Sequence, residues 1–207
     1  MAFLTQGLYL ISTGLLVPVI IVLFVLFIQS LLLLGGFYAS YITRTKHSRK
    51  LNDLLPKIEE TLQSKAPVNR SDISALLPDN DRFSRSLQAV IGSTNGVILE
   101  KALSDFELAC EKELDRGKIL IRMGPMFGLM GTLIPMAPAL AGLAAGDLSA
   151  MADNMQVAFS TTVIGVLVGA IGFFSYTLKR RWFKEDMRNL EYVKDLVKNG
   201  AVKREVE

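Results

Sequence analysis

The feature that most constrains the fold is a long N-terminal stretch without charge. No Asp, Glu, Lys or Arg occurs from Ala2 to Thr43, and Leu, Ile, Val and Phe dominate residues 8–38. A helix that crosses a bilayer needs roughly 20 apolar residues, and this stretch exceeds that length. Two more charge-free stretches, Met123–Gly146 and Met155–Leu178, each contain 24 residues. The sequence therefore predicts an all-α membrane protein with three transmembrane helices.

The first of these helices is predicted to remain in the mature chain. A cleaved signal peptide combines a basic N-terminal region with a short apolar stretch. Here the apolar stretch is long and no charged side chain precedes it. A hydrophobic content of 50% and a mean hydropathy of +0.35 also exceed what one water-soluble core requires.

Basic residues follow the first helix, precede the second and follow the third. They are Arg44, Lys46, Arg49, Lys50, Arg116, Lys118, Arg122, Lys179, Arg180, Arg181 and Lys184. Loops rich in Lys and Arg stay in the cytoplasm, so we expect the N-terminus outside and the C-terminus inside. The link between helices two and three contains Asp147 and Asp153 but no basic residue, which favours the outside. The net charge of +3 is thus typical of a membrane topology rather than of a nucleic-acid surface.

These observations divide the chain into six predicted segments. They are a short extracytoplasmic N-terminus with the first transmembrane helix (1–43), a cytoplasmic helical domain (44–122), the second transmembrane helix (123–146), an extracytoplasmic loop (147–154), the third transmembrane helix (155–178) and a cytoplasmic C-terminal amphipathic helix (179–207).

The cytoplasmic segments are predicted to be helical throughout. Apolar residues at steps of three and four indicate one helix over 51–62, either kinked or started at Pro56, then a turn at 64–69 and a short helix over 71–77. A heptad-like stripe comprises Leu99, Leu103, Phe106, Cys110, Leu114, Gly117 and Ile121. Since nothing breaks this helix before the second crossing, we expect one long extension below the membrane. The C-terminal stripe of Trp182, Phe183, Met187, Leu190 and Leu196 is expected to pack against it.

The cytoplasmic insert offers no catalytic chemistry. It has no phosphate-binding glycine loop, no metal-ligand cluster and no nucleophile with a plausible base, so neither an enzyme nor a cofactor is expected. Cys110 is interpreted as a small apolar packing residue, and His47 as a solvated side chain. The Asp and Glu residues are interpreted as solvated faces and intrahelical pairs.

Small residues and hydroxyls set the second and third crossings apart from simple membrane anchors. Gly128 and Gly131 mark one surface, and Gly165 with Gly169 forms a second, where a neighbouring backbone can approach. That neighbour is equally well a helix of the same chain or of another copy. The hydroxyls at membrane depth are Thr132, Ser160, Thr161 and Thr162.

A single membrane hydroxyl most often bonds the carbonyl one turn back, but several together can line an ion path. If Thr132 and Thr162 face the same side, they form a polar strip that stabilises an ion, a water chain or a carboxylate. The interiors of the crossings contain no Asp, Glu, Lys, Arg or His. An ion transporter built on this chain would therefore need a carboxylate from a second protein.

The motifs from Gly128 to Thr132 and from Thr161 to Gly165 resemble the signature of the MotA/TolQ/ExbB proton-channel family, in its three-helix ExbB/TolQ branch. The resemblance implies a proton-channel subunit of a rotary or force-transducing motor in the inner (cytoplasmic) membrane. It also implies a homopentameric ring around a dimer of single-span partners similar to ExbD, TolR or MotB, each of which carries one membrane Asp. Thr132 and Thr162 match the family's channel threonines, and Pro125 matches the proline that begins the second-crossing motif.

The chain departs from the family pattern at two places. Gln156 and Val157 stand where ExbB-like members have a glutamate, and Pro135 stands where members often have Gly. With Pro138, Pro135 is expected to bend the outer half of the second helix. Two alternatives to the proton channel stay open: a non-conducting oligomeric scaffold whose threonines only pack, and a sodium-driven stator-type subunit.

Overall fold

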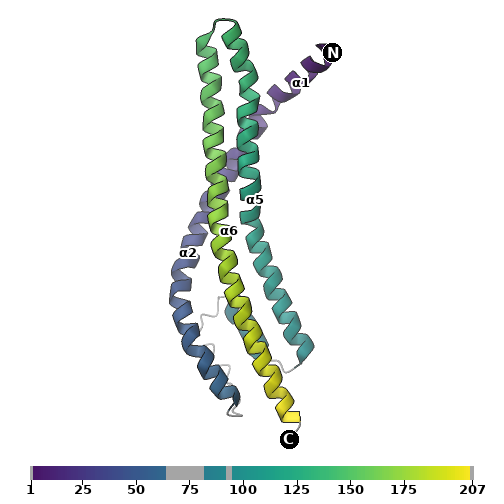
Figure 1. The fold of residues 1–207 in the computed structure, drawn as a ribbon, viewed down its shortest axis with the longest axis vertical. Coiled ribbons are helices and arrows are strands. Elements are labelled where there is room, and N and C mark those ends of the chain that lie inside the picture. The colour runs from purple at the N-terminus through teal and green to yellow at the C-terminus, as the bar shows by residue number, and fades with distance from the viewer. Residues whose placement is uncertain (1, 64–81, 92–94, 206–207) are drawn as a thin grey trace. The chain divides into compact units, whose positions relative to one another are not determined.

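The computed structural model describes residues 2–63, 82–91 and 95–205. Each element in these ranges is a helix, which confirms the all-α class (Figure 1). The helices are α1 (Ala2–Gly14), α2 (Leu16–Gln63), α4 (Arg82–Ile91), α5 (Gly96–Ala144) and α6 (Leu148–Glu205). Three helical stretches are long and apolar enough to cross a membrane, as predicted: Gly7–Ile42, Gly96–Ala144 and Leu148–Lys198. The turn and short helix expected between 64 and 77 lie outside the described residues.

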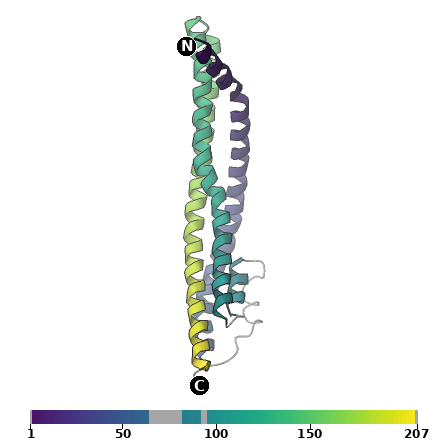
Figure 2. The same cartoon turned by 90° about the vertical axis from the view of Figure 1, so that its right-hand side faces the viewer.

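The chain forms two compact units. Unit 1 comprises residues 1–37 and 115–177, and unit 2 comprises residues 38–114 and 178–207. In unit 1, α5 and α6 lie side by side in Figure 1, and in Figure 2 α5 lies in front of α6. The close glycine contacts show that the two helices touch there. A second contact in unit 1 joins these two helices to α2 through a buried cluster of Leu26, Leu120 and Val168.

The first apolar stretch folds as two helices rather than one. α1 ends at Gly14, and the Leu15 amide donates to the carbonyls of both Ile11 and Ser12 at 3.1 Å. Such shared hydrogen bonds are common at helix ends. α1 then points away from the direction of α2 (Figure 1).

α2 continues without a break from the membrane segment to Gln63. The helix expected over 51–62 is therefore the end of α2, and it does not start at Pro56. The apolar spacing predicted the helix correctly but not its continuity with the first crossing.

α5 runs without interruption from the segment before the second crossing into that crossing, as the sequence predicts. Asn95 caps its start, because the Asn95 side-chain oxygen accepts a hydrogen bond of 3.0 Å from the Val97 amide. The helix then holds 49 residues, about 74 Å at 1.5 Å per residue. Pro125, Pro135 and Pro138 all lie inside it.

The connection between α5 and α6 is shorter than predicted. Only residues 145–147 separate the helices, and 148–154, expected as loop, are the first turns of α6. Gly146 takes a φ of 76°, which a glycine adopts without strain.

Hydrogen bonds close both helix ends at this turn. The Asp147 amide donates to the Gly142 carbonyl at 2.9 Å and the Gly146 amide to the Leu143 carbonyl at 3.1 Å, which is a Schellman motif. The Asp147 carboxylate caps α6 by accepting from the Ala150 amide at 3.0 Å. The turn thus satisfies backbone groups of both helices with only three linking residues.

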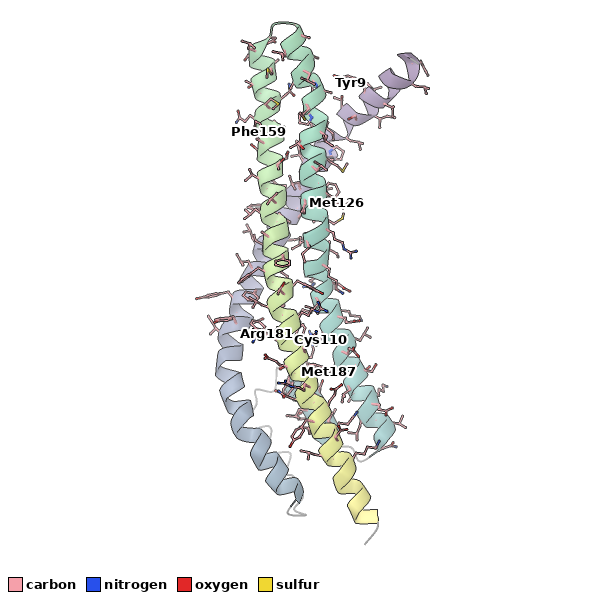
Figure 3. All side chains as sticks on the ribbon, viewed as in Figure 1. Tyr9, Cys110, Met126, Phe159, Arg181 and Met187 are labelled. Atoms are coloured by element: carbon pink, nitrogen blue, oxygen red, sulfur yellow. The ribbon has the colours of Figure 1, made fainter. Side chains whose placement is uncertain are left out.

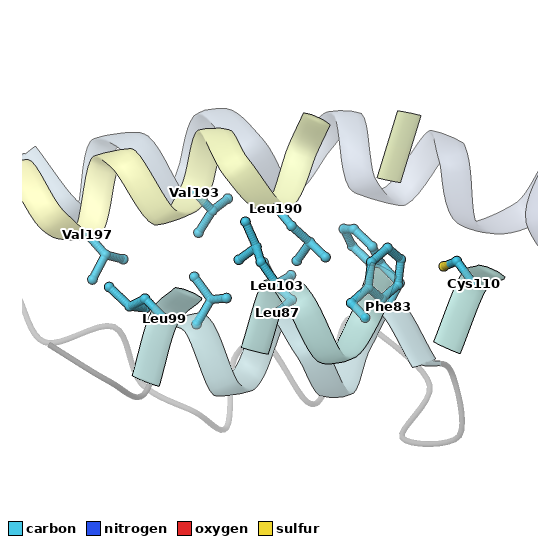
Figure 4. Packing of buried hydrophobic residues seen from close by; sticks show 10 residues of the cluster. Phe83, Leu87, Leu99, Leu103, Cys110, Leu190, Val193 and Val197 are labelled. Atoms are coloured by element: carbon cyan, nitrogen blue, oxygen red, sulfur yellow. The ribbon is translucent and has the colours of Figure 1, made fainter. Parts of the chain in front are cut away.

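Unit 2 has a core of large apolar side chains (Figure 4). Its buried members come from α4, α5 and α6: Phe83, Leu87, Val90, Leu99, Leu103, Phe106, Cys110, Leu190, Val193 and Val197. The core confirms that the C-terminal stripe packs on α5, although Val193 and Val197 are buried more deeply than the predicted Leu196 and Trp182. Cys110 is a buried packing residue as expected, and burial raises the pKa of its thiol to about 11.

One carboxylate of unit 2 is not the solvated side chain that the sequence predicts. Glu113 accepts a hydrogen bond from the Lys179 ammonium at 2.7 Å and another from the Arg82 guanidinium at 2.9 Å. Burial by itself raises the pKa of the Glu113 carboxyl, but the bonds and charges of Lys179 and Arg82 outweigh it and hold that pKa below its ordinary value. The Lys179 side chain is only 10% exposed, so this ion pair joins α5 to α6 beside the core.

Candidate functional site

The contact between α5 and α6 in unit 1 is made by glycines whose backbones touch. A Cβ atom built on Gly165 would lie 2.6 Å from the Gly124 carbonyl oxygen and 2.7 Å from the Gly128 Cα. A Cβ on Gly124 would in turn lie 2.8 Å from the Gly165 carbonyl oxygen. These gaps are too small for any side chain. The two predicted glycine surfaces therefore pack against each other within one chain.

The contact continues from this central point toward the N-terminal part of α5. Gly169 packs on the Pro125 ring, since its Cβ would lie 3.0 Å from the Pro125 Cγ. Further along, a Cβ on Gly172 would lie 2.8 Å from the Leu120 Cβ. Gly172 was not among the predicted packing residues, although its spacing of three from Gly169 continues the same helix face. Pro135 is fully buried.

Thr161 fills the position opposite Gly131. A Cβ on Gly131 would lie 2.6 Å from the Thr161 Cβ and 2.7 Å from its hydroxyl oxygen. The Thr161 side chain is buried, and its hydroxyl donates to the Ala158 carbonyl at 2.9 Å and approaches the Val157 carbonyl at 3.1 Å. Thr161 is thus a packing residue between the helices of the single chain.

Thr132 and Thr162 lie on one side of the α5–α6 pair. In α5, Leu120 faces α2, and Thr132 lies about 120° around the helix from it. In α6, Val168 faces α2, and Thr162 also lies about 120° around the helix from it. Because α5 and α6 are antiparallel, equal rotations about the two helix axes lead to the same side of the pair (Figure 1). Thr162 also lies beside Gly128 of the contact. Both threonines are therefore on the side away from α2, and both are half-buried.

Ser160 lies on another face of α6. Two positions along an α-helix correspond to about 200° of rotation, so Ser160 and Thr162 point in nearly opposite directions. Ser160 is exposed, as is its neighbour Phe159, which projects away from α5 (Figure 3). The structure thus brings two of the four predicted hydroxyls to one side, places Thr161 between the helices and puts Ser160 apart.

All four hydroxyls make the local bond expected for membrane helices. Thr132 donates to the Leu129 carbonyl at 2.7 Å, Ser160 to Gln156 at 2.8 Å and Thr162 to Ala158 at 3.3 Å. A hydroxyl that donates its proton in this way keeps oxygen lone pairs as acceptors. In Thr132 and Thr162 these acceptors are on the half-exposed side of the pair, where a proton donor, a water or a cation can reach them.

No charged group of the two crossings accompanies these hydroxyls. The sequence contains no Asp, Glu, Lys, Arg or His from Met123 to Gly146 or from Met155 to Leu178. In the part of the chain that the structure describes, no group of three or more His, Cys, Asp or Glu side chains could hold a metal ion. The surface beside Thr132 and Thr162 offers oxygen acceptors but no proton carrier.

Three long apolar helices and a glycine contact that brings two of them together define an all-helical membrane protein. The model of the MotA/TolQ/ExbB proton channel family matches residues 78–192, more than half of the chain. The chain belongs to this family, whose members are channel and transducer subunits of membrane motors. No curated protein matches the chain in a sequence search. The family match reaches well beyond the two motifs and takes in α4, most of the described unit 2 core and the Glu113–Lys179 pair.

Proposed function

We propose that this chain is the proton-channel subunit of a force-transducing motor in the inner membrane. By likeness to the family, its copies form a homopentameric ring around a dimer of single-span partners that each supply one membrane Asp. The observation that carries the proposal is the pair of half-buried hydroxyls, Thr132 and Thr162, on the side of the α5–α6 pair that α2 leaves uncovered.

The chemistry of these two hydroxyls suits a carboxyl group that changes its protonation state. A protonated carboxyl can donate to the free lone pairs of either threonine. An ionised carboxylate needs donors instead, and a threonine hydroxyl can rotate away from its own carbonyl to provide one. Because an unpaired charge is costly at membrane depth, such donors lower the barrier to each proton exchange.

The exposed apolar residues of α5 support an assembly in which this helix contacts other chains. Met126, Leu129, Leu133 and Met136 are all exposed in the single chain, and Figure 3 shows Met126 projecting from α5. Methionine adapts its shape to more than one neighbour, which suits a surface past which a partner helix moves. Under the proposal these residues face either the next copy or the partner.

A scaffold that conducts no ions is the second candidate function. One observation favours it: each of the four hydroxyls already has a carbonyl partner within its own helix. In that case the threonines only pack and the partner needs no carboxylate. A sodium-driven motor is a variant of the main proposal, since hard cations take oxygen ligands such as hydroxyls.

The test is ion flux into liposomes that contain this chain together with a single-span partner that carries one membrane Asp. Thr132→Val and Thr162→Val remove the hydroxyls with little change of shape, and each is expected to lower proton flux about tenfold or more. Ser160→Ala is the matched control, because it removes a hydroxyl from the other face of α6 and should leave the flux unchanged. Equal flux in all variants would end the channel proposal, and flux that requires Na⁺ would identify the stator-type variant.

A further inference from the structure

α1 is a separate helix that the first membrane crossing does not need. The apolar stretch Gly7–Ile42 holds 36 residues, about 54 Å of helix, whereas a hydrocarbon core is about 30 Å thick. The charge-free part of α2 from Leu16 to Thr43 is about 42 Å long and spans that core by itself. Residues 2–14 therefore extend beyond the length of one crossing. The chain changes direction at Leu15, between α1 and α2.

α1 has an apolar face and a polar face. Five apolar residues fall within about 160° of the helix circumference, and all are more exposed than Tyr9: Phe3, Leu4, Leu8, Leu10 and Ile11. Tyr9, Ser12 and Thr13 fall within about 100° on the opposite side, and Thr13 donates to the Tyr9 carbonyl at 2.9 Å. Figure 3 shows Tyr9 on α1, clear of α5 and α6. This pattern is typical of a helix at a boundary between water and lipid.

We infer that α1 lies in the plane of the membrane interface, at the end of the first crossing opposite Arg44, with its apolar face in the lipid. Its partner is the lipid surface itself. The apolar residues of α1 continue directly into the membrane helix, so they reach the same bilayer. α1 carries no Lys or Arg, so its contact requires no anionic lipid and resists salt. The inference does not depend on ion conduction.

Fluorophore quenching in vesicles of phosphatidylcholine tests this placement. Leu8→Cys and Ile11→Cys report the apolar face, and Ser12→Cys and Thr13→Cys report the polar face. Ile21→Cys in α2 is the membrane-spanning control. Each replaced side chain is at least partly exposed, so the variants leave no cavity.

Labelling of the parent chain measures the background. Cys110 is the only cysteine in the sequence, and its side chain is buried. A thiol reagent should therefore label the parent chain weakly, and signal from each variant comes from the new cysteine.

We expect the label at positions 8 and 11 to be quenched about twofold more by lipids brominated near the headgroup than by lipids brominated deep in the chain. At positions 12 and 13, aqueous iodide should quench about threefold more than at 8 and 11. The label at position 21 should be quenched most by lipids brominated deep in the chain. Depth that increases steadily from position 8 to 13 would show a crossing helix, and iodide quenching at all four would show a helix in water. Either result overturns the inference.

Discussion

The α5–α6 contact of unit 1 and the core of unit 2 are built on the same two helices from opposite kinds of residue. In unit 1 the contact is made by Gly, Thr and Pro, and the backbones touch. In unit 2 it is made by Leu, Val and Phe. The difference follows from the solvent. Lipid is as apolar as leucine, so helices in it associate through close backbone packing. In water, burial of large apolar side chains supplies the free energy.

The largest expected effect is in the unit 2 core. Leu190→Ala removes a fully buried side chain from between α4, α5 and α6 and should lower the free energy of unfolding by about 2–5 kcal/mol. Leu108→Ala, at an exposed position of α5, is the control and should change it by less than about 0.5 kcal/mol. Denaturation in detergent measures both. If Leu190→Ala lowered the free energy of unfolding as little as Leu108→Ala, the core would not stabilise the chain.

The glycine contact should respond to an added methyl group rather than to a lost one. Gly165→Ala places a Cβ within 2.6 Å of the Gly124 carbonyl oxygen and should destabilise the chain by about 1–3 kcal/mol. Gly35→Ala lies in the apolar part of α2 with no atom within 4 Å of the new Cβ, so it should be neutral or slightly stabilising. A thermal melt in detergent distinguishes them. An unchanged melt for Gly165→Ala would show that the helices separate readily.

The Glu113–Lys179 pair should make stability depend on pH. Because the folded-state pKa of Glu113 is lowered, its contribution is complete above the unfolded pKa of about 4.3 and is lost as pH falls through the folded pKa. Glu113→Gln should lower the free energy of unfolding by about 1 kcal/mol at pH 7, after allowance for the partial exposure of the pair. The variant should also lose less stability than the parent chain as the pH falls. Asp115→Asn, from the exposed Asp115–Lys118 pair, is the control and should lose stability at acid pH as the parent chain does. Urea titrations between about pH 3 and 7 measure the difference.

The smallest effect is expected at two buried serines, one in each unit. The hydroxyls of Ser84 in unit 2 and Ser175 in unit 1 are buried without a hydrogen-bond partner among the described residues. Replacing such a hydroxyl by hydrogen removes a desolvation cost, so Ser84→Ala and Ser175→Ala should each be neutral or stabilising by up to about 1 kcal/mol. Melts of the two variants beside the parent chain measure this. A clear loss of stability in either variant would reveal a buried water or a second chain that bonds the serine.

Much of the fold could be predicted because it depends on local patterns. The spans follow from runs without charge, and the stripe from Leu99 to Cys110 follows from its spacing. The tight turn also has local signals, since Gly146 favours a helix end and Asp147 a helix start, but a longer outside loop was expected there. The break after Gly14 was missed although it too has a local signal, since Pro18 has no amide hydrogen to donate to the Gly14 carbonyl.

The rest depends on how helices are rotated against each other. Ser160, Thr161 and Thr162 are consecutive hydroxyls, and only the position of Gly131 opposite Thr161 shows which of them is enclosed. Glu113 and Lys179 are 66 residues apart, so no local pattern links them. The sequence alone could name the candidate residues but not separate those that pack from those that face outward.

The fit of Thr161 against Gly131 has a mechanical consequence. If α6 slid along α5 by one turn in one direction, Thr161 would have to enter the space beside Gly124 that only a glycine hydrogen fills. A slide in the other direction would bring Gly165 opposite Gly131 and leave a void between two glycines. Within unit 1 the two helices therefore resist sliding past each other. We expect the second and third crossings to move as a pair, with the backbone contact holding their register.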